Sequence, residues 1–378
     1  MMAALSAWSD RLLGRGEASI TVPVFDGALK SNQLIEDATV LAELTAPADL
    51  ATDGVSVFVA NGSRVWQHDG QSANWAPSEF AYGAAPAGQA ITALACLPNG
   101  GMALALDGKV IQIVGGPQGG RRFDSVAGAP LNAVNAISAT NSGRLFATDG
   151  SVTQPAERWK HDLMELGKSG RVLEFNLTDG SSRERAAGLA YAYGACETAQ
   201  GLWACESWRH RVVRVGSDNG GRGETLKPVV DNLPGYPSRL APAAGGGYWL
   251  TCFALRTQLV EFVLREPSFR KRMLKEIEPA YWIAPALNSG NTFLEPMQGA
   301  HLKMMGVVKP WAPPRSYGLV IRLTEDGRIR YSLHSRFDGH HHGVVAAVEC
   351  AGHLYLLAKG CNRLLRISVS ELERSLAA

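Results

Sequence analysis

A run of three histidines between two glycines, Gly339 to Gly343, offers side chains that titrate near neutral pH. Neighbouring residues of an extended chain point to opposite sides, so His340 and His342 are the two that can converge on one point. A converging histidine can take a proton as a general base, and we predict this role for His340 and His342. A solvated loop is the alternative. A transition-metal site is a weaker alternative, because no Cys or acid lies at the spacing of metal ligands.

Tyr193 and Arg239 are the other candidates for catalysis. An arginine presents a planar fork of donors to a carboxylate, phosphate or enolate, and a tyrosine hydroxyl can donate to an oxyanion. With Asn135 they would hold the oxyanion that develops when an ester or lactone carbonyl is attacked. The alternative is that Arg239 pairs with a structural acid. The candidates for substrate binding are Asp49, Asn135, Trp159, His161, Tyr236 and Ser238.

An internal repeat is what would bring these residues together. One template recurs six times: a strand of small residues, a Gly turn, an apolar strand, another turn and a strand rich in Val, Ile or Leu. A unit of 40–45 residues with about four short strands is typical of propeller blades, which stack because one sheet cannot bury both of its faces alone. The units begin at Asp49, Ile91, Val134, Ala192, Tyr236 and Val344.

The repeat predicts an all-β fold, a single six-bladed β-propeller over residues 1–378. The residue that opens each unit then lies on the central channel, which is the default ligand site. We expect the ring to close by pairing of residues near Asn32–Leu44 with the last blade. Two long spacings mark insertions: residues 151–169 form a loop on the third blade, and residues 255–315 form a cap.

The cap insertion has two halves of different character. Its first half, QLVEFVLREPSFRKRMLKEI, has apolar residues at helical spacing, and its second half is rich in Pro, Met and aromatic residues. We expect a lid over a pocket; a surface for a partner or for oligomer formation is the alternative. Trp159 and His161, in the shorter insertion, would reach over the same face.

Composition excludes several classes of function. The formal charge of +2, from 37 basic and 35 acidic residues, gives no case for nucleic acid or an anionic membrane. The six cysteines are scattered with no CxxC pair, which favours buried thiols in a reducing compartment. No apolar run reaches the ~18 residues of a membrane span, and the polar first 16 residues indicate a short amphipathic helix rather than a signal peptide. We therefore expect a cytoplasmic protein acting on a small molecule.

Several segments resemble the strictosidine synthase-like family, in the branch of adipocyte plasma membrane-associated protein. They read VPVFDGALKSNQLIEDA from Val22, GRVLEF from Gly170, PGYP from Pro234 and AGHLYL from Ala351. The family is related to the gluconolactonase, regucalcin and paraoxonase propellers. The resemblance implies a six-bladed propeller and a small-molecule enzyme, and in the lactone- and ester-cleaving relatives a channel calcium held by two carboxylates and two amides.

The turns that match those ligands differ in this chain. They read Ala46-Pro47-Ala48, Asn135-Ala136, Ala192-Tyr193-Gly194 and Pro237-Ser238-Arg239, so both carboxylates are absent and a cation is added. We expect no cofactor; calcium held by Asp49 and Asn135 is the alternative. The glutamate that plant strictosidine synthase uses corresponds to Val345, so that reaction is not expected. The hydrolase hypothesis is retained, with a metal-free lyase or condensing enzyme and a non-catalytic binding propeller as alternatives.

Overall fold

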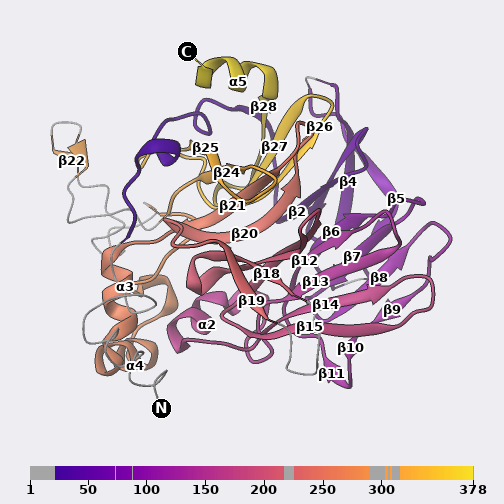
Figure 1. Ribbon diagram of the computed structural model, residues 1–378, viewed down its shortest axis with the longest axis horizontal. Coiled ribbons are helices and arrows are strands. Elements are labelled where there is room, and N and C mark those ends of the chain that lie inside the picture. The colour runs from indigo at the N-terminus through magenta and orange to yellow at the C-terminus, as the bar shows by residue number, and fades with distance from the viewer. Residues whose placement is uncertain are drawn as a thin grey trace.

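The computed structural model describes residues 22–72, 74–86, 88–216, 225–289, 303–304, 307–308 and 316–377. Within them, six antiparallel four-stranded sheets form the blades of a β-propeller (Figure 1). Blades 1 to 3 are β2 (Pro47–Thr52), β3 (Ser56–Asn61), β4 (Arg64–Asp69), β5 (Ser78–Ala84); β6 (Ile91–Cys96), β7 (Met102–Leu106), β8 (Val110–Val114), β9 (Arg122–Phe123); and β12 (Val134–Ala139), β13 (Arg144–Asp149), β14 (Gly170–Asn176), β15 (Ser182–Leu189).

Blades 4 to 6 complete the ring. They are β16 (Ala192–Thr198), β17 (Gly201–Glu206), β18 (Arg211–Val215), β19 (Leu226–Val230); β20 (Gly235–Pro242), β21 (Tyr248–Leu255), β24 (Leu319–Leu323), β25 (Ile329–His334); and β26 (Val344–Cys350), β27 (His353–Ala358), β28 (Arg363–Ser368), β1 (Thr39–Glu43). The first strands of neighbouring blades contact one another all the way around the axis. The predicted fold and the number of blades are confirmed.

The ring is closed by a strand from the N-terminal side of the chain. β1 pairs antiparallel with β28, from Thr39 opposite Arg366 to Glu43 opposite Arg363. β1 is thus the outer strand of the last blade, so blade 6 is built from both ends of the chain. This is the closure predicted near Asn32–Leu44.

A repeated hydrogen bond fixes where four of the inner strands begin. A residue at or just after the end of the second strand carries a carboxylate or amide, which accepts the backbone N–H of a residue one or two places before the inner strand, at 2.7–2.9 Å. Such a bond satisfies a donor that the turn would otherwise leave unpaired. The pairs are Asn61 with Ala46, Asp107 with Ala90, Asp149 with Ala133 and Glu206 with Ala190.

Alternating residues of the strands pack between the blades. Ala93, Ala95, Ala103 and Ala105 are fully or almost fully buried where blades 2 and 3 meet, and small residues suit the narrow space near the axis. Larger side chains such as Trp203 are buried in the core between blades 4 and 5. The cysteines described as buried, such as Cys205 and Cys252, belong to these cores and are free thiols.

The two insertions lie together over one end of the ring. The first contains η3 (Ala156–Arg158) and α2 (Trp159–Glu165), so the expectation of a plain loop is wrong. The second begins with α3 (Gln258–Arg265), α4 (Pro267–Glu276) and η5 (Pro279–Tyr281), as the helical spacing predicts. Arg270 on α4 donates to the carbonyl of Met164 on α2, which ties the two insertions together.

Smaller elements complete the described chain. They are η2 (Gly27–Leu29), β10 (Ser125–Val126), β11 (Ala129–Pro130), β22 (Lys303–Met304), β23 (Val307–Val308), η4 (Ser207–Arg209), η7 (Lys359–Cys361) and the C-terminal α5 (Val369–Ala377). Residues 290–302, 305–306 and 309–315 lie outside the described residues, as does the predicted N-terminal helix. The predicted lid in the Pro- and Met-rich half therefore stays a prediction.

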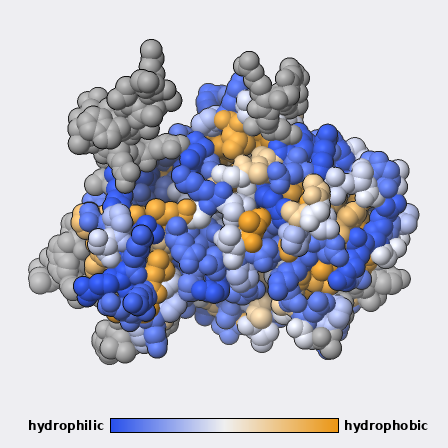
Figure 2. All heavy atoms as spheres, turned by 90° about the horizontal axis from the view of Figure 1, so that it is seen from below, coloured by the Kyte–Doolittle hydropathy of each residue, from blue (hydrophilic) through white to orange (hydrophobic). Residues whose placement is uncertain are grey.

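The face in Figure 2 is largely hydrophilic, and its apolar side chains form small separate patches. None of the helices formed by the described residues has the length and apolar character needed to cross a membrane.

Candidate functional site

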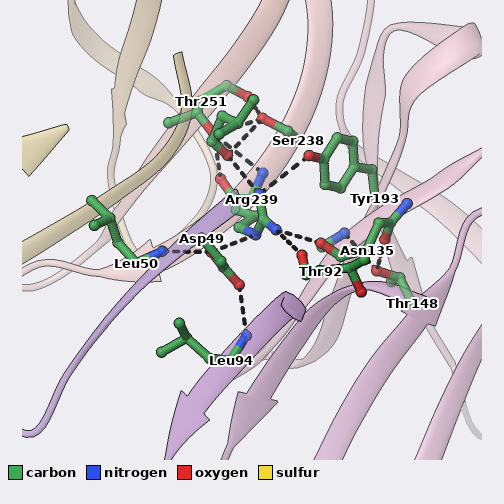
Figure 3. Close-up of polar contacts among 12 residues, drawn as sticks. Asp49, Leu50, Thr92, Leu94, Asn135, Thr148, Tyr193, Ser238, Arg239 and Thr251 are labelled. Carbon is green, nitrogen blue, oxygen red and sulfur yellow. Dashed lines mark hydrogen bonds and ion pairs between the residues drawn. The ribbon is translucent and has the colours of Figure 1, made fainter. Parts of the chain in front are cut away.

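Arg239, on β20, is buried at the centre of the ring and contacts all five other blades (Figure 3). Its Nε lies 2.9 Å from Asp49 Oδ1 of blade 1. The two other nitrogens donate to oxygen atoms of the remaining four blades: to the Tyr193 hydroxyl and the Val345 carbonyl, both at 3.2 Å, to the Thr92 carbonyl at 3.5 Å and to the Asn135 carbonyl. Both Nη atoms of the guanidinium therefore donate to the protein itself, and Nε is ion-paired with Asp49.

Asp49 is the carboxylate that faces this cation. It is buried, its Oδ1 also accepts the N–H of Leu50 at 2.8 Å, and its Oδ2 accepts the N–H of Leu94 at 3.0 Å. Burial raises the pKa of Asp49 to about 6, although Arg239 and the two N–H donors lower it. Burial lowers the pKa of Arg239, but Asp49 and Tyr193 together raise it and leave it above the ordinary value. At pH 7 the two groups form a buried ion pair.

Small polar side chains hold the strands around this pair. Asn135 is locked at both ends: its amide donates to the Ala192 carbonyl at 3.0 Å, and its oxygen accepts from Thr148 Oγ1 at 2.7 Å. Ser238 Oγ lies 2.7 Å from Thr251 Oγ1. The predicted binding residues Asn135 and Ser238 thus help to fix the inner strands, and Asn135 also lines a pocket at the start of those strands.

Gly194 allows two inner strands to approach. Its φ is +93°, a region that favours glycine, and a Cβ there would lie 2.6 Å from the Ser238 carbonyl oxygen and 2.8 Å from Arg239 Cα. No other residue fits without moving β16 away from β20. The position of Tyr193 relative to Arg239 depends on this close approach.

The side chains around the axis do not suit a calcium ion. Calcium takes six to eight oxygen ligands, usually with several carboxylates, whereas Asp49 is the one carboxylate here and already has three partners. The carbonyls that point inward accept hydrogen bonds from Arg239. Among the described residues, no three His, Cys, Asp or Glu side chains gather as metal ligands. The positive charge at the centre of this ring is the guanidinium of Arg239.

A pocket of about 450 Å³ lies on the side of Arg239 where the inner strands begin; we call it the upper pocket. Its walls combine the starts of the inner strands with the two insertions and are largely apolar and aromatic. Lining side chains include Trp159, Tyr191, Tyr193, Phe253, Val345 and Leu287. A second cavity of about 800 Å³ lies on the opposite side, where the inner strands end, and Asp49 and Arg239 line that one.

Tyr193 connects the ion pair to the upper pocket. Its oxygen accepts from Arg239 Nη1, and the guanidinium carbon lies 5.1 Å from the centre of its ring. Burial raises the pKa of Tyr193, so the phenol stays neutral and keeps its proton. Because the oxygen already accepts from a cation, the hydroxyl is polarised and its own proton remains available to a ligand.

Two ionisable residues of the upper pocket were not singled out from the sequence. Lys359, on η7, and Glu157, on η3, both line the pocket. Burial, and after it the charge of Arg239, lower the pKa of Lys359, while Glu157 and Asp49 act in the opposite direction. Aligning the repeats could have located Lys359: AKGCNRLLR from Ala358 matches ESWRHRVVR from Glu206, and both form a 3₁₀ turn ended by a left-handed residue.

The histidines do not occupy the place predicted for them. His340 is exposed with Nδ1 3.1 Å from Glu36, whereas His342 is buried with Nδ1 2.8 Å from Ser316 Oγ and Nε2 2.9 Å from the Arg336 carbonyl. The two rings have separate partners, and neither lines the upper pocket. The loop is held outward by Glu36 and Arg336, so the geometry gives a general-base role for His340 or His342 no support.

The remaining predicted residues divide between the pocket and the cap. Trp159 lines the upper pocket, with its ring 5.3 Å from that of Phe253. His161 packs edge-on against Trp282 at 4.7 Å, and Tyr236 is buried against His210 at 4.6 Å. His161 and Tyr236 therefore pack against other aromatic side chains, and neither lines the upper pocket.

Comparisons with known proteins agree with this fold. No family model matches the chain. Adipocyte plasma membrane-associated protein of Salmo salar is 27% identical over 262 residues, which are 65% of this chain and 54% of the relative. The strictosidine synthase-like 6 protein of Arabidopsis thaliana is 28% identical over 139 residues, 36% of each chain. The chain therefore spans about half the length, or less, of these curated relatives.

A solved structure supports the architecture alone. It is that of a presumed gluconolactonase, with a TM-score of 0.53 and 14% identity, covering 88% of this chain and 91% of the other. Its likeness extends over the ring of blades. By sequence, the homologues of this chain are adipocyte plasma membrane-associated protein and the strictosidine synthase-like proteins.

Proposed function

We propose that this chain is a small-molecule enzyme that binds a carbonyl compound in the upper pocket, with hydrolysis of an ester or lactone as the reaction. The observation that carries the proposal is the Tyr193 phenol, which is hydrogen-bonded to the buried Arg239 and borders the pocket. The names of the relatives and of the fold neighbour point to the same broad class.

In this proposal Tyr193 stabilises the oxyanion. A donor that is already oriented where negative charge develops gains strength from the low-dielectric surroundings and needs no rearrangement during the reaction. Arg239 acts through Tyr193, since its own donors are bound to the protein. The role first assigned to Arg239 therefore changes from oxyanion ligand to positioning residue.

The pocket supplies the base as well. Besides Tyr191 and Tyr193, the ionisable side chains among its described lining residues are Glu157 and Lys359, so one of these two, rather than a histidine, would take the proton from the attacking water. We also propose that the reaction proceeds without calcium, because the cation at the axis is Arg239. The localisation expected from the sequence stays a proposal.

A panel of p-nitrophenyl esters and five- and six-membered lactones tests the proposal. Tyr193→Phe keeps the ring and removes the donor, and should lower kcat by ~10²-fold with little change in KM. Tyr191→Phe is the matched control: Tyr191 lines the same pocket and its ring stacks on Trp208 at 4.4 Å. Equal losses in both variants, or unchanged turnover in Tyr193→Phe, would contradict the oxyanion role.

The second candidate is a metal-free lyase or condensing enzyme. One observation favours it: an amine with a lowered pKa, Lys359, stands in the pocket. Absence of turnover on the whole ester and lactone panel would move the proposal to this candidate, or to the non-catalytic binding propeller.

A further inference from the structure

Lys359 differs in its surroundings from the other lysines of the described chain. It opens η7 at the turn between β27 and β28 and remains accessible to the upper pocket. Lys359 is itself exposed, but the space it faces is the upper pocket, whereas Lys109 and Lys271 are exposed on the outside of the blades and cap. Within the described residues, no hydrogen bond or ion pair holds the Lys359 side chain. Its amine is therefore available to whatever enters the pocket.

The electrostatic surroundings of this amine are fixed by the fold. Arg239 repels the protonated form of Lys359, and because its donors bind the other blades it cannot turn away. Desolvation of the amine acts in the same direction on its pKa and is the larger effect. Desolvation and a neighbouring cation are the two conditions that turn a lysine into a nucleophile.

The rest of the pocket completes a carbonyl site. Tyr193 offers a polarised O–H donor to a carbonyl oxygen, and Glu157 is a carboxylate that can carry protons. The aromatic walls, which include Trp159, Tyr191 and Phe253, fit the apolar or aryl body of a small molecule. Amine, hydroxyl donor and carboxylate thus line one aromatic pocket.

We propose that the Lys359 ε-amine forms an imine with the carbonyl carbon of an aldehyde or ketone that carries an apolar or aryl group and is bound in the upper pocket. This inference rests on the proposed function only in that both need a carbonyl compound in that pocket. It names a different substrate class from esters and lactones, and it directs the reaction toward carbon–carbon or carbon–nitrogen bond chemistry.

The step balances without any further reagent. The nitrogen lone pair of the neutral amine attacks the carbonyl carbon, a C–N bond forms, and the C=O π electrons pass to the oxygen, which is stabilised by the Tyr193 hydroxyl. The nitrogen gives up two protons and the oxygen gains two, with Glu157 as the carrier. The oxygen then leaves as water, and the imine C=N bond remains.

Reductive trapping tests this on the full chain. The protein is incubated at pH 7 with 4-phenylbutan-2-one and sodium cyanoborohydride, which reduces an imine to a stable secondary amine, and adducts are located by peptide mass spectrometry. We expect adduct formation at Lys359 at least about tenfold faster than at any other lysine. Lys359→Arg keeps the charge and should abolish the fast adduct. Lys109→Arg, on an exposed turn, is the control and should leave it unchanged.

The outcomes separate this inference from the proposed function. Labelling spread over surface lysines, or a fast adduct that persists in Lys359→Arg, overturns the inference. If trapping fails while esters or lactones are turned over in a Tyr193-dependent manner, the inference falls and the proposed hydrolase stands. If Lys359 is trapped and the panel is inert, the inference stands and hydrolysis is abandoned. Because the adduct is mapped on the wild-type chain, the test survives even if Lys359→Arg folds poorly.

Discussion

Replacing Arg239 with methionine is the perturbation for which the structure gives the sharpest expectation. Methionine keeps most of the volume and removes the cation, so Asp49 is left buried with two N–H donors but no counter-charge. Three inward carbonyls each lose one donor at the same time. Removing one partner of a buried ion pair costs about 3–5 kcal/mol of unfolding free energy.

The size of the effect on melting follows from the length of the chain. With about 2.1 cal/mol/K of unfolding entropy per residue, 378 residues give roughly 0.8 kcal/mol/K, so Arg239→Met should lower Tm by roughly 4–6 °C. Scanning calorimetry at a fixed scan rate measures this. Arg322→Met is a matched control for loss of a buried arginine, because Arg322 lies on β24 and has no part in the axial ion pair.

The pH dependence of the stability deficit shows whether the unpaired charge of Asp49 causes it. The folded-state pKa of Asp49 is already raised to about 6, above its ordinary value of 3.8, and removing Arg239 raises it further. An acid whose pKa is raised by folding destabilises the protein above that pKa and ceases to do so when it is protonated. The deficit of Arg239→Met relative to wild type should therefore be largest near pH 8 and shrink as the pH falls toward 6.

Asp49→Asn in the Arg239→Met background provides a second test of the ion pair. It removes the unpaired charge, so the double variant should recover part of the lost Tm and lose the pH dependence of the deficit. A deficit equal at pH 6 and pH 8, or a double variant less stable by the sum of the two single losses, would refute the assignment of Arg239 and Asp49 as one coupled unit.

Two further expectations concern the same region. Gly194→Ala should lower Tm by several degrees because its Cβ would meet the Ser238 carbonyl. The control is Gly128→Ala, which has φ +80° and nothing within 4 Å of its Cβ and should cost only about 1 kcal/mol of unfolding free energy. Equal losses in the two variants would show that the close approach at Gly194 is relieved elsewhere. Calorimetric titration of calcium into chelator-stripped protein should give no saturable heat up to millimolar concentration, and micromolar binding would mean that Asp49 leaves Arg239 for the metal.

The sequence was sufficient for the fold because the fold is repetitive. Six similar units with turn residues at matching positions specify six blades, and strand-like residues before the first unit specify the closure. The residues that open each unit were placed on the channel by the same logic, and the structure does bring Asp49, Asn135, Tyr193 and Arg239 together there.

The roles of the individual side chains could not be read in this way. Whether Arg239 faces a ligand or the protein depends on where backbone carbonyls of distant strands point, and no spacing encodes that. The histidine run was misleading because its chemistry is suggestive, while its position is set by Glu36, some 300 residues earlier in the chain. Lys359 went unnoticed because an isolated lysine after an apolar strand looks like any surface turn.

The central position of Arg239 also has a consequence for how the chain is synthesised. Its partners lie between Asp49 and Val345, so the last of them leaves the ribosome about a hundred residues after Arg239 itself. Until blade 6 arrives, the guanidinium has no complete set of acceptors and remains hydrated in an open arc of blades. Full burial of this one side chain therefore depends on completion of the ring, and the cation that meets all the other blades is encoded in the chain itself.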